Sequence, residues 1–180
     1  KLDSVVWIPA FAGMTIYMKE IIDVQIGEVR RAREDVILKS KAIGSCIAVV
    51  AYDVKRGIGG MAHIMLPGAA PVDKKQQEKT KYAANAIEAL VEQMAELGSN
   101  NGDIEVTLVG GGNVLNRPDD TICRDNIRST LEFLAKHDLA VKVQSIGGTS
   151  RRSVSLDVKR GIVFYTEGNG GETQLWRACG

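Results

Sequence analysis

Histidine, cysteine and aromatic residues are scarce in this chain of 180 residues. There are two histidines and three cysteines, and aromatic residues make up 5% of the sequence. Cys46, Cys123 and Cys179 form no CxxC pair, and two histidines supply no cluster with the spacing of a metal site. We therefore expect neither a bound metal nor a cofactor. The few aromatic side chains argue against a stacking platform for nucleic-acid bases.

A strong charge of one sign and a long hydrophobic run are also missing. The formal net charge is +1, so the protein has no overall field that would attract nucleic acid or anionic lipid. No apolar run reaches the roughly 20 residues that a membrane-spanning helix needs. An odd number of cysteines without a pattern is typical of a reducing cytosol, so we expect a cytoplasmic protein.

The remaining composition is that of one globular domain. Hydrophobic residues make up 44% and charged residues 25% of the chain, which are ordinary values. Residues 1–17 are apolar but lack the basic start of a signal peptide. We expect them to be a disordered extension outside the domain, with the working protein beginning near Met18. The domain is expected over 18–166, followed by a Gly-rich tail, 167–180, that frays.

Apolar and polar residues alternate in short stretches on both sides of two helical patterns. Apolar residues at steps of three and four predict a helix over 74–97, and Asp125 or Asn126 could cap a second helix that closes at His137. Strands are expected within 19–33 and at 36–38, 47–52, 58–66, 104–109, 140–146, 153–156 and 162–165. About eight strands and two helices predict an α+β fold. We expect a single-domain layered sandwich of mixed or antiparallel β-sheet, with both helices packed on one side.

Two apolar stretches joined by a turn predict a β-hairpin. Ile47–Tyr52 and Ile58–Leu66 flank the turn sequence Asp53-Val54-Lys55-Arg56-Gly57. Cys46 comes just before the first strand, and His63 lies within the second. The count of residues places Cys46 opposite His63, although the register decides whether the side chains meet. A thiol beside an imidazole is the minimal pair of nucleophile and base.

Three other features each have two interpretations. The turn sequence Asp53–Ile58 recurs as Asp157–Ile162, which indicates either an ancient duplication or, as we favour, two hairpins with the same turn. Gly110-Gly111-Gly112 could be a phosphate loop. No Gly-Lys-Ser/Thr follows it, so a tight turn at a strand end is favoured. Arg151-Arg152 is either an anion contact or a solvated pair.

The sequence carries motifs of a known family. Gly44-Ser45-Cys46, followed by Gly59-Gly60-Met61-Ala62-His63-Ile64-Met65-Leu66-Pro67, resembles the signature of CheD, the chemoreceptor glutamine deamidases of bacterial chemotaxis. Downstream, Gly110–Asn113 resembles the Gly-rich turn of the family, and Gly147–Arg152 resembles its closing segment. The resemblance runs from about Met18 to Tyr165.

The resemblance implies both a reaction and its partners. Members hydrolyse glutamine side chains of methyl-accepting chemotaxis receptors to glutamate with release of ammonia, and some also hydrolyse receptor glutamyl methyl esters. A CheC-type phosphatase is the implied partner. Cys46 matches the family nucleophile and His63 the base. Ser40 stands six residues before the cysteine, where the family has threonine, and keeps the hydroxyl.

This assignment gives a mechanism that coordinates can examine. We expect a Cys46 thiolate stabilised by a His63 imidazolium, with Ser40 accepting from the far ring N–H. Main-chain N–H groups around Gly44 and Ser45 are the expected donors to the tetrahedral oxyanion. A thioester on Cys46 would then be hydrolysed.

Other functions stay open at this point. One is a docking module with weak or lost catalysis that regulates CheC and the receptors, because serine replaces threonine at position 40. Another is a redox sensor at Cys46, although the sequence has no nearby resolving cysteine. An apolar setting for a cysteine or a histidine is also compatible with a purely structural core residue.

Overall fold

A computed structural model describes residues 19–119 and 121–179 of the chain. Along the chain, the elements in these ranges are β1 (Glu20–Asp23), β2 (Val29–Arg33), β3 (Val36–Ile43), β4 (Ile47–Asp53), β5 (Ile58–Ile64), α1 (Gln76–Lys79), α2 (Ala83–Glu96), a 3₁₀ turn η1 (Asn101–Asp103), β6 (Ile104–Gly110), α3 (Ile122–Lys136), β7 (Ala140–Ile146), β8 (Arg152–Asp157), β9 (Ile162–Glu167) and β10 (Thr173–Arg177).

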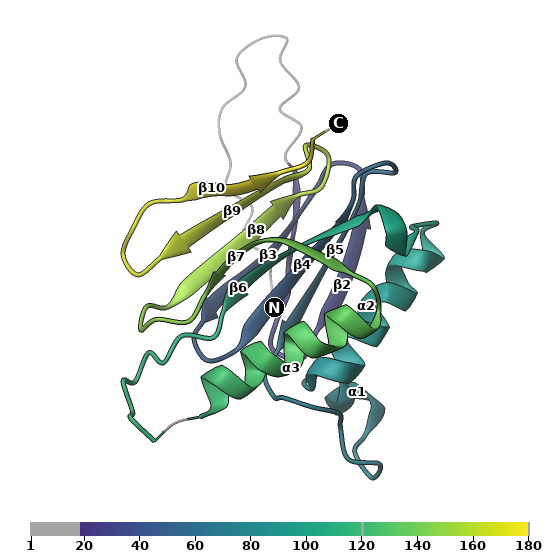
Figure 1. The fold of residues 1–180 in the computed structure, drawn as a ribbon. Helices are drawn as coiled ribbons and strands as arrows, with labels where there is room; N and C mark the ends of the chain where they lie inside the picture. Colours follow the sequence, from purple (N-terminus) through teal and green to yellow (C-terminus); the bar gives the residue numbers. More distant parts are fainter. Residues whose placement is uncertain (1–18, 120, 180) are drawn as a thin grey trace, which may run out of the picture.

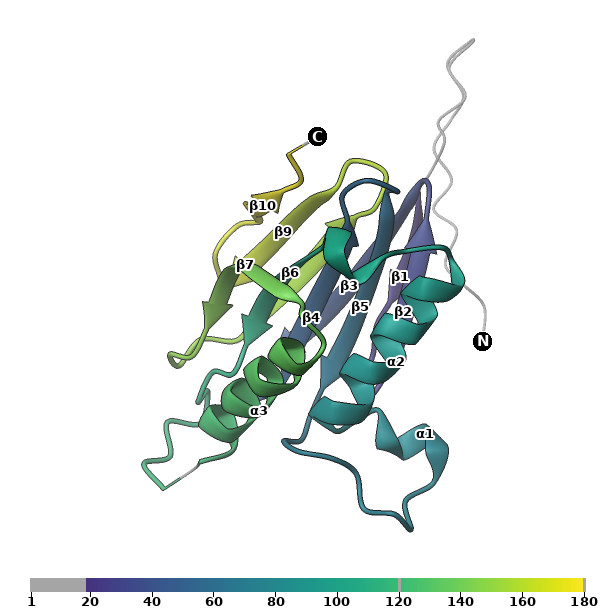
Figure 2. The ribbon, with the colours of Figure 1, turned by 45° about the vertical axis from the view of Figure 1, so that its right-hand side comes forward.

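Two five-stranded sheets face each other, and α2 and α3 cover the outer face of one of them (Figure 1). The strand order is β1-β3-β8-β9-β10 in the first sheet and β2-β5-β4-β6-β7 in the second. Both sheets are mixed, because β1 runs parallel to β3 and β6 runs parallel to β7. The same three layers are visible in the turned view (Figure 2). The predicted α+β layered sandwich is confirmed, with ten strands in the described ranges rather than about eight.

Two apolar cores join the three layers. One lies between the helices and the second sheet and includes Ile87, Leu90 and Leu108, and the other lies between the two sheets. Every residue of β4 is buried, because its two faces contribute to different cores. A strand covered on both faces is expected to be apolar without alternation, which explains the run Ile47–Ala51.

Both predicted helices have different bounds in the structure. The helix predicted over 74–97 is divided into α1 and α2, because Tyr82 is extended and the Ala83 N–H donates to the carbonyl of Leu66. The second helix, α3, begins at Ile122, so the assignment of Asp125 or Asn126 as its cap was wrong. Within the described residues, no helix has the length and apolar character needed to span a membrane.

The end of the chain corrects a second expectation. Instead of fraying, Thr173–Arg177 pairs antiparallel with β9 as strand β10. The Trp176 ring packs edge-on against Tyr52 with centroids 6.0 Å apart, and Leu175 also packs on the core between the sheets. Burial of these apolar side chains stabilises the tail despite its glycines. The expected N-terminal extension, 1–17, and the start at Met18 lie outside the described residues.

Candidate active site

The hairpin of β4 and β5 brings Cys46 and His63 to the same side of the second sheet. The pairing is antiparallel, as predicted, but Ala48 rather than Cys46 is the partner of His63. The shift is two residues, so the alternation of side chains keeps Cys46 on the face of Ala48 and His63. That face is the one turned toward the first sheet, since Ala48 and Cys46 both belong to the core between the sheets. The prediction that Cys46 lies directly opposite His63 was therefore wrong by two residues. The two side chains nevertheless belong to the same face of the sheet.

Ser40, on β3 of the first sheet, holds the His63 ring. Its Oγ lies 2.8 Å from Nδ1 of His63 and 2.9 Å from the carbonyl oxygen of Val24. A carbonyl only accepts, so the single hydroxyl proton goes to Val24 and Oγ accepts a proton from Nδ1. The ring is thereby held as the Nδ1–H tautomer, which leaves a lone pair on Nε2. Within the described residues this buried Nε2 has no hydrogen-bond partner.

A small cavity opens beside the loop of residues 44–46, which carries Cys46. It has a volume of about 220 Å³, and its lining includes Gly44, Ser45, Cys123 and Arg151. Cys46 itself is partly exposed, whereas His63 is only 2% exposed. The lining reaches the residues just before Cys46 and includes neither Cys46 nor His63. Cys123 brings a thiol to this cavity, which the sequence spacing did not reveal.

The Gly-rich turn after β6 packs against the loop that carries Cys46. The N–H of Gly111 donates to the carbonyl of Cys46 at 2.7 Å, and the N–H of Gly112 donates to the carbonyl of Gly44 at 2.8 Å. A Cβ at Gly110 would overlap the Cys46 carbonyl oxygen, which explains the need for glycine there. The favoured interpretation as a strand-end turn is supported, because these N–H groups are already bonded to carbonyls and are not open to a phosphate.

Asn126 is a polar residue of the site that sequence reasoning placed wrongly. It is fully buried on α3, and its Nδ2 donates to the carbonyls of Ser45 at 2.9 Å and Met65 at 3.0 Å. It thus connects the loop of Cys46 to the chain just after His63. A signal was present, because Asn126 lies on the buried face of the helix together with Thr130 and Leu134.

Burial shifts the pKa values of Cys46 and His63 in opposite directions. It raises the pKa of the Cys46 thiol, against the opposing effect of its own backbone N–H, and the nearby Cys123 raises it further. Burial also lowers the pKa of His63, against the opposing effect of the Val24 carbonyl. Both directions favour the neutral form, for the thiol and for the ring. They run against the thiolate–imidazolium pair expected from the sequence.

The two arginines of the closing segment have different roles. Arg152 is 6% exposed and donates to the Gly147 carbonyl at 2.7 Å and to Glu167 at 2.6 Å. It holds the turn at Gly147 and is neither a solvated residue nor an open anion contact. Arg151 is exposed and lines the cavity beside Ser45.

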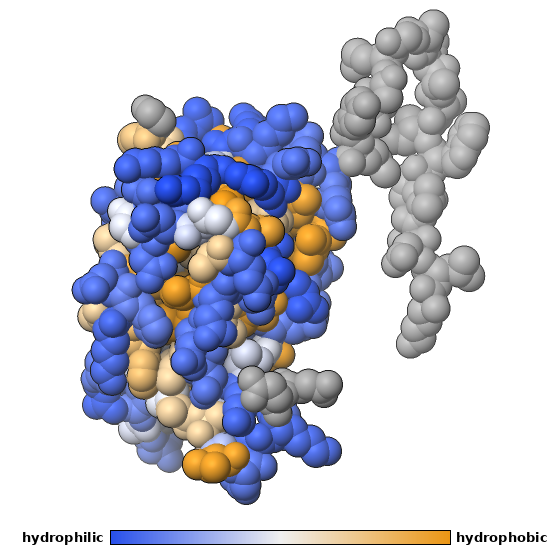
Figure 3. Space-filling model, turned by 90° about the vertical axis from the view of Figure 1, so that its right-hand side faces the viewer, coloured by the Kyte–Doolittle hydropathy of each residue, from blue (hydrophilic) through white to orange (hydrophobic). Residues whose placement is uncertain are grey.

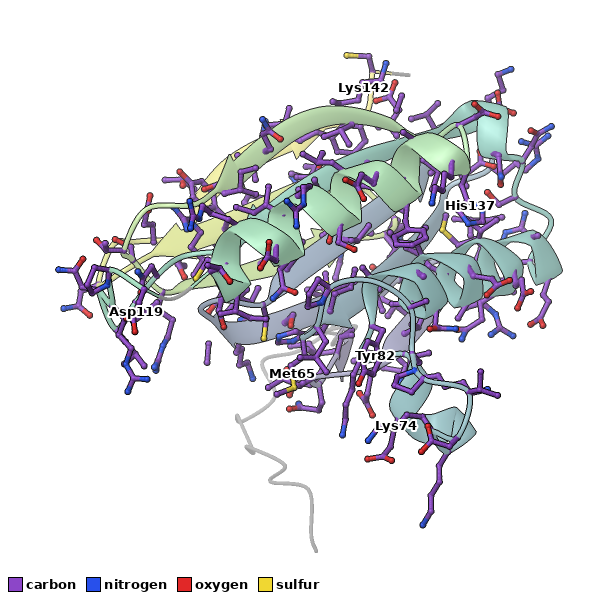
Figure 4. The ribbon with its side chains drawn as sticks, turned by 60° about the horizontal axis from the view of Figure 1, so that its bottom comes forward. Met65, Lys74, Tyr82, Asp119, His137 and Lys142 are labelled. Atoms are coloured by element: carbon purple, nitrogen blue, oxygen red, sulfur yellow. The ribbon has the colours of Figure 1, made fainter. Side chains whose placement is uncertain are left out.

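The other histidine and the larger cavities lie away from this cluster. His137 caps the end of α3, at the opposite end from Asp119 (Figure 4). Cavities of about 520 and 630 Å³ lie between β2 and α2, on a face that is mostly hydrophilic (Figure 3). Their linings include none of Ser40, Cys46 and His63. Of the three cavities, the smallest one is lined by Gly44 and Ser45, which lead directly to Cys46.

Comparison with known proteins identifies the family. Residues 65–167 match the family model described as "CheD chemotactic sensory transduction". His63 lies just before the matched range, and Cys46 lies further upstream. A protein of Chlorobium luteolum, named "Probable chemoreceptor glutamine deamidase CheD", is 40% identical over 150 residues, which cover 83% of this chain and 74% of that protein. Proteins of the same name from Haloarcula marismortui and Methanococcus maripaludis are 33% and 30% identical. Each alignment covers 83% of this chain, with 87% and 96% of the respective relative.

Among solved structures, the crystal structure of the Bacillus licheniformis hypothetical protein YfiH aligns with 69% of this chain and 59% of that one. The TM-score is 0.40 and the identity 16%, which is too weak a likeness to bear on fold or function. The family model matches more than half of the chain, and the three relatives each cover 83% of it. The chain belongs to the CheD family.

Proposed function

We propose that this chain is a cytoplasmic protein-glutamine deamidase that converts glutamine side chains of methyl-accepting chemotaxis receptors to glutamate. The observation that carries the proposal is the contact of Ser40 with Nδ1 of His63 at 2.8 Å. It leaves the lone pair of Nε2 on the face of the sheet that also carries Cys46. The relatives named as chemoreceptor glutamine deamidases supply the substrate class.

The first half of the reaction forms a thioester. As the Cys46 sulfur attacks the carboxamide carbon, Nε2 of His63 takes the thiol proton, so the thiolate arises only during attack. Backbone N–H groups of the loop at Ser45 and Cys46 receive the negative charge that develops on the carbonyl oxygen. The C–N bond then breaks, and the imidazolium gives its proton to the leaving nitrogen, which departs as ammonia.

The second half restores the enzyme. Nε2 takes a proton from water as the water oxygen attacks the thioester carbon, and the C–S bond breaks. The imidazolium returns a proton to the sulfur, and the product is the glutamate side chain. The sum is one water consumed and one ammonia released for each glutamine. A glutamyl methyl ester presents the same carbonyl with methanol as the leaving group, so we include receptor methylesterase activity in the proposal.

The replacement of threonine by serine does not favour the alternative of an inactive docking module. The contacts of position 40 with His63 and Val24 are made by Oγ, and a serine supplies that atom as a threonine does. A CheC-type phosphatase remains the proposed protein partner, on the family resemblance alone.

The test is ammonia release from a receptor cytoplasmic fragment by wild type and by Cys46→Ala. We expect Cys46→Ala to lose at least ~10³-fold in kcat, and His63→Ala to lose nearly as much. Ser40→Thr should be neutral or better, because the hydroxyl is retained. Ser40→Ala should lose at least about 10-fold, since the ring loses the acceptor that orients it.

The alternatives give different results in the same assay. If the protein is only a docking module, the wild type should bind the receptor fragment and release no ammonia. If it is a redox sensor, the wild type should respond to peroxide and release no ammonia. Glutamate formation by Cys46→Ala at the wild-type rate would show that Cys46 is not the nucleophile. Melting temperatures of all variants serve as the control for folding.

A further inference from the structure

We propose that Asn126 is a positioning residue that aims the backbone N–H of Cys46 at the oxyanion. This inference rests on the proposed deamidase function and adds a residue to it. The juxtaposition that suggests it is a buried carboxamide on α3, 2.9 Å from the Ser45 carbonyl, in the peptide that leads directly to the nucleophile.

Three consecutive carbonyls of the nucleophile loop are each held by a different donor. Gly44 accepts from the N–H of Gly112, Ser45 from Nδ2 of Asn126, and Cys46 from the N–H of Gly111. In a trans peptide, the carbonyl and the following N–H point in opposite directions. Fixing these carbonyls therefore turns the N–H groups of Ser45 and Cys46 away from their donors. The N–H of Cys46 then lies beside its own sulfur, where it lowers the pKa of the thiol against the effect of burial.

Asn126 is the one of the three donors that belongs to a side chain. Its orientation is determined by the structure, because both hydrogens of Nδ2 have carbonyl acceptors, at Ser45 and at Met65. A flipped amide would place Oδ1 against two carbonyl oxygens. In the observed orientation Oδ1 is buried without a hydrogen-bond partner in the described part of the chain. Such a group costs stability, which is consistent with a role in positioning rather than in packing alone.

Removal of the carboxamide should affect two reactions of Cys46 differently. Without Nδ2, the Ser45–Cys46 peptide loses the hydrogen bond that fixes its plane. The direction of the Cys46 N–H is then no longer fixed. Attack on a carboxamide builds negative charge on an oxygen and needs that donor. Alkylation by iodoacetamide displaces iodide from a saturated carbon and builds no oxyanion, so it reports only on the thiol and its access.

The experiment measures both reactions in Asn126→Ala and in a matched control, Asn85→Ala. Asn85 lies on α2, and its Oδ1 accepts from the N–H of Ala70 at 2.8 Å, so this control also removes a bond between a helix asparagine and the backbone. For Asn126→Ala we expect kcat for ammonia release to fall by about 100-fold or more, with little change in the rate of Cys46 alkylation. For Asn85→Ala we expect little change in either rate.

Three results would overturn the proposal. Wild-type kcat in Asn126→Ala would show that the bond is not needed. An equal loss of alkylation and of ammonia release would show that Asn126 places the sulfur or supports the fold instead. If wild type releases no ammonia, the proposed deamidase function is wrong, and the role of Asn126 is wrong with it. If wild type and Asn126→Ala are equally active, only the role of Asn126 is wrong.

A second variant keeps the test decisive if Asn126→Ala does not fold. In Asn126→Ser the hydroxyl retains a small polar group but is too short to reach both carbonyls. It should show the same split between kcat and alkylation, and a loss of both rates in equal proportion would again contradict the proposal.

Discussion

A single backbone carbonyl determines which nitrogen of His63 can act as a base. The oxygen of Val24 has no proton to give, so Ser40 must donate to it and must accept from Nδ1 of the ring. The fixed tautomer leaves Nε2 as the proton acceptor. Ser40 thus holds the ring in one tautomer, as the third member of a catalytic triad does in other enzymes. Only the hydroxyl of residue 40 makes these contacts, so a serine supplies them as a threonine would.

At the scale of residues, the sequence predicted the groups that carry a recognisable motif. Cys46, His63 and Ser40 were identified by resemblance, and the structure shows the predicted contact between Ser40 and His63. Val24 could not be predicted, because any residue supplies a backbone carbonyl. Asn126 was mistaken for a helix cap, because asparagine is common at caps and the start of α3 lies four residues earlier.

The protonation state of Cys46 gives a prediction about its reactivity. Burial raises its pKa, so the thiol is protonated at neutral pH, and its thiolate fraction should grow about tenfold per pH unit until that pKa is reached. We expect iodoacetamide labelling of Cys46, followed by peptide mass spectrometry, to be slow at about pH 6 and to rise steadily through about pH 8.

The same peptide map reports Cys179 separately, as an exposed thiol in the same sample. Rapid labelling of Cys46 that hardly changes between about pH 6 and pH 8 would contradict the neutral pair. It would restore the thiolate–imidazolium pair that the motif alone suggests.

At the scale of elements, local turn chemistry was read correctly and the register was not. Asp53 and Asp157 each accept a backbone N–H through Oδ1, and Gly57 and Gly161 follow with φ of 65° and 59°. The repeated sequence therefore makes the same turn in two hairpins that lie in different sheets. The partner of His63 depends on where the turn is centred. Asp53 pairs with Ile58, so the turn is centred between Lys55 and Arg56, one residue later than the prediction assumed.

Gly110, the last residue of β6, should be among the least replaceable positions. It has φ of 127°, and an added Cβ would overlap the Cys46 carbonyl and lie 2.6 Å from the Ile43 side chain. We expect Gly110→Ala to cost about 1–3 kcal/mol of unfolding free energy from overpacking, in addition to about 1–2 kcal/mol for the backbone conformation. The molecules of Gly110→Ala that do fold should also release ammonia more slowly than wild type, because the loop that carries Cys46 is displaced.

The matched control is Gly98→Ala, at a glycine with φ of 92° and no atom within 4 Å of the added Cβ. Gly98→Ala should lose only the unfolding free energy that comes from the backbone conformation, and it should keep full activity. Urea unfolding and ammonia release measure both effects. Equal stability of the two variants would refute the close approach of the Gly-rich turn to the Cys46 loop.

At the scale of the whole molecule, the site is assembled where all three layers meet. Ser40 comes from the first sheet, Cys46 and His63 from the hairpin of the second, and Asn126 from the helical layer. Periodicity predicted the layers, because each strand and helix shows which face it buries. It could not predict the strand order or the two parallel pairs, which depend on contacts between segments far apart in the chain.

The end of the chain shows the same limit. Glycines at 168, 170 and 171 suggested fraying, yet Leu175 and Trp176 pack on the core between the sheets. Their burial is visible only once β9 and Tyr52 are in place beside them. Two large apolar side chains in a five-residue stretch were the signal that the glycines obscured.

The most direct test of the central claim is the mass of the enzyme after an acid quench during turnover. Wild type mixed with a receptor cytoplasmic fragment should carry the fragment, less the mass of ammonia, as a thioester on the peptide that contains Cys46. The adduct should be absent from Cys46→Ala. Conversion of glutamine to glutamate without any such adduct, or with the adduct on another residue, would contradict a mechanism in which Cys46 opens the carboxamide.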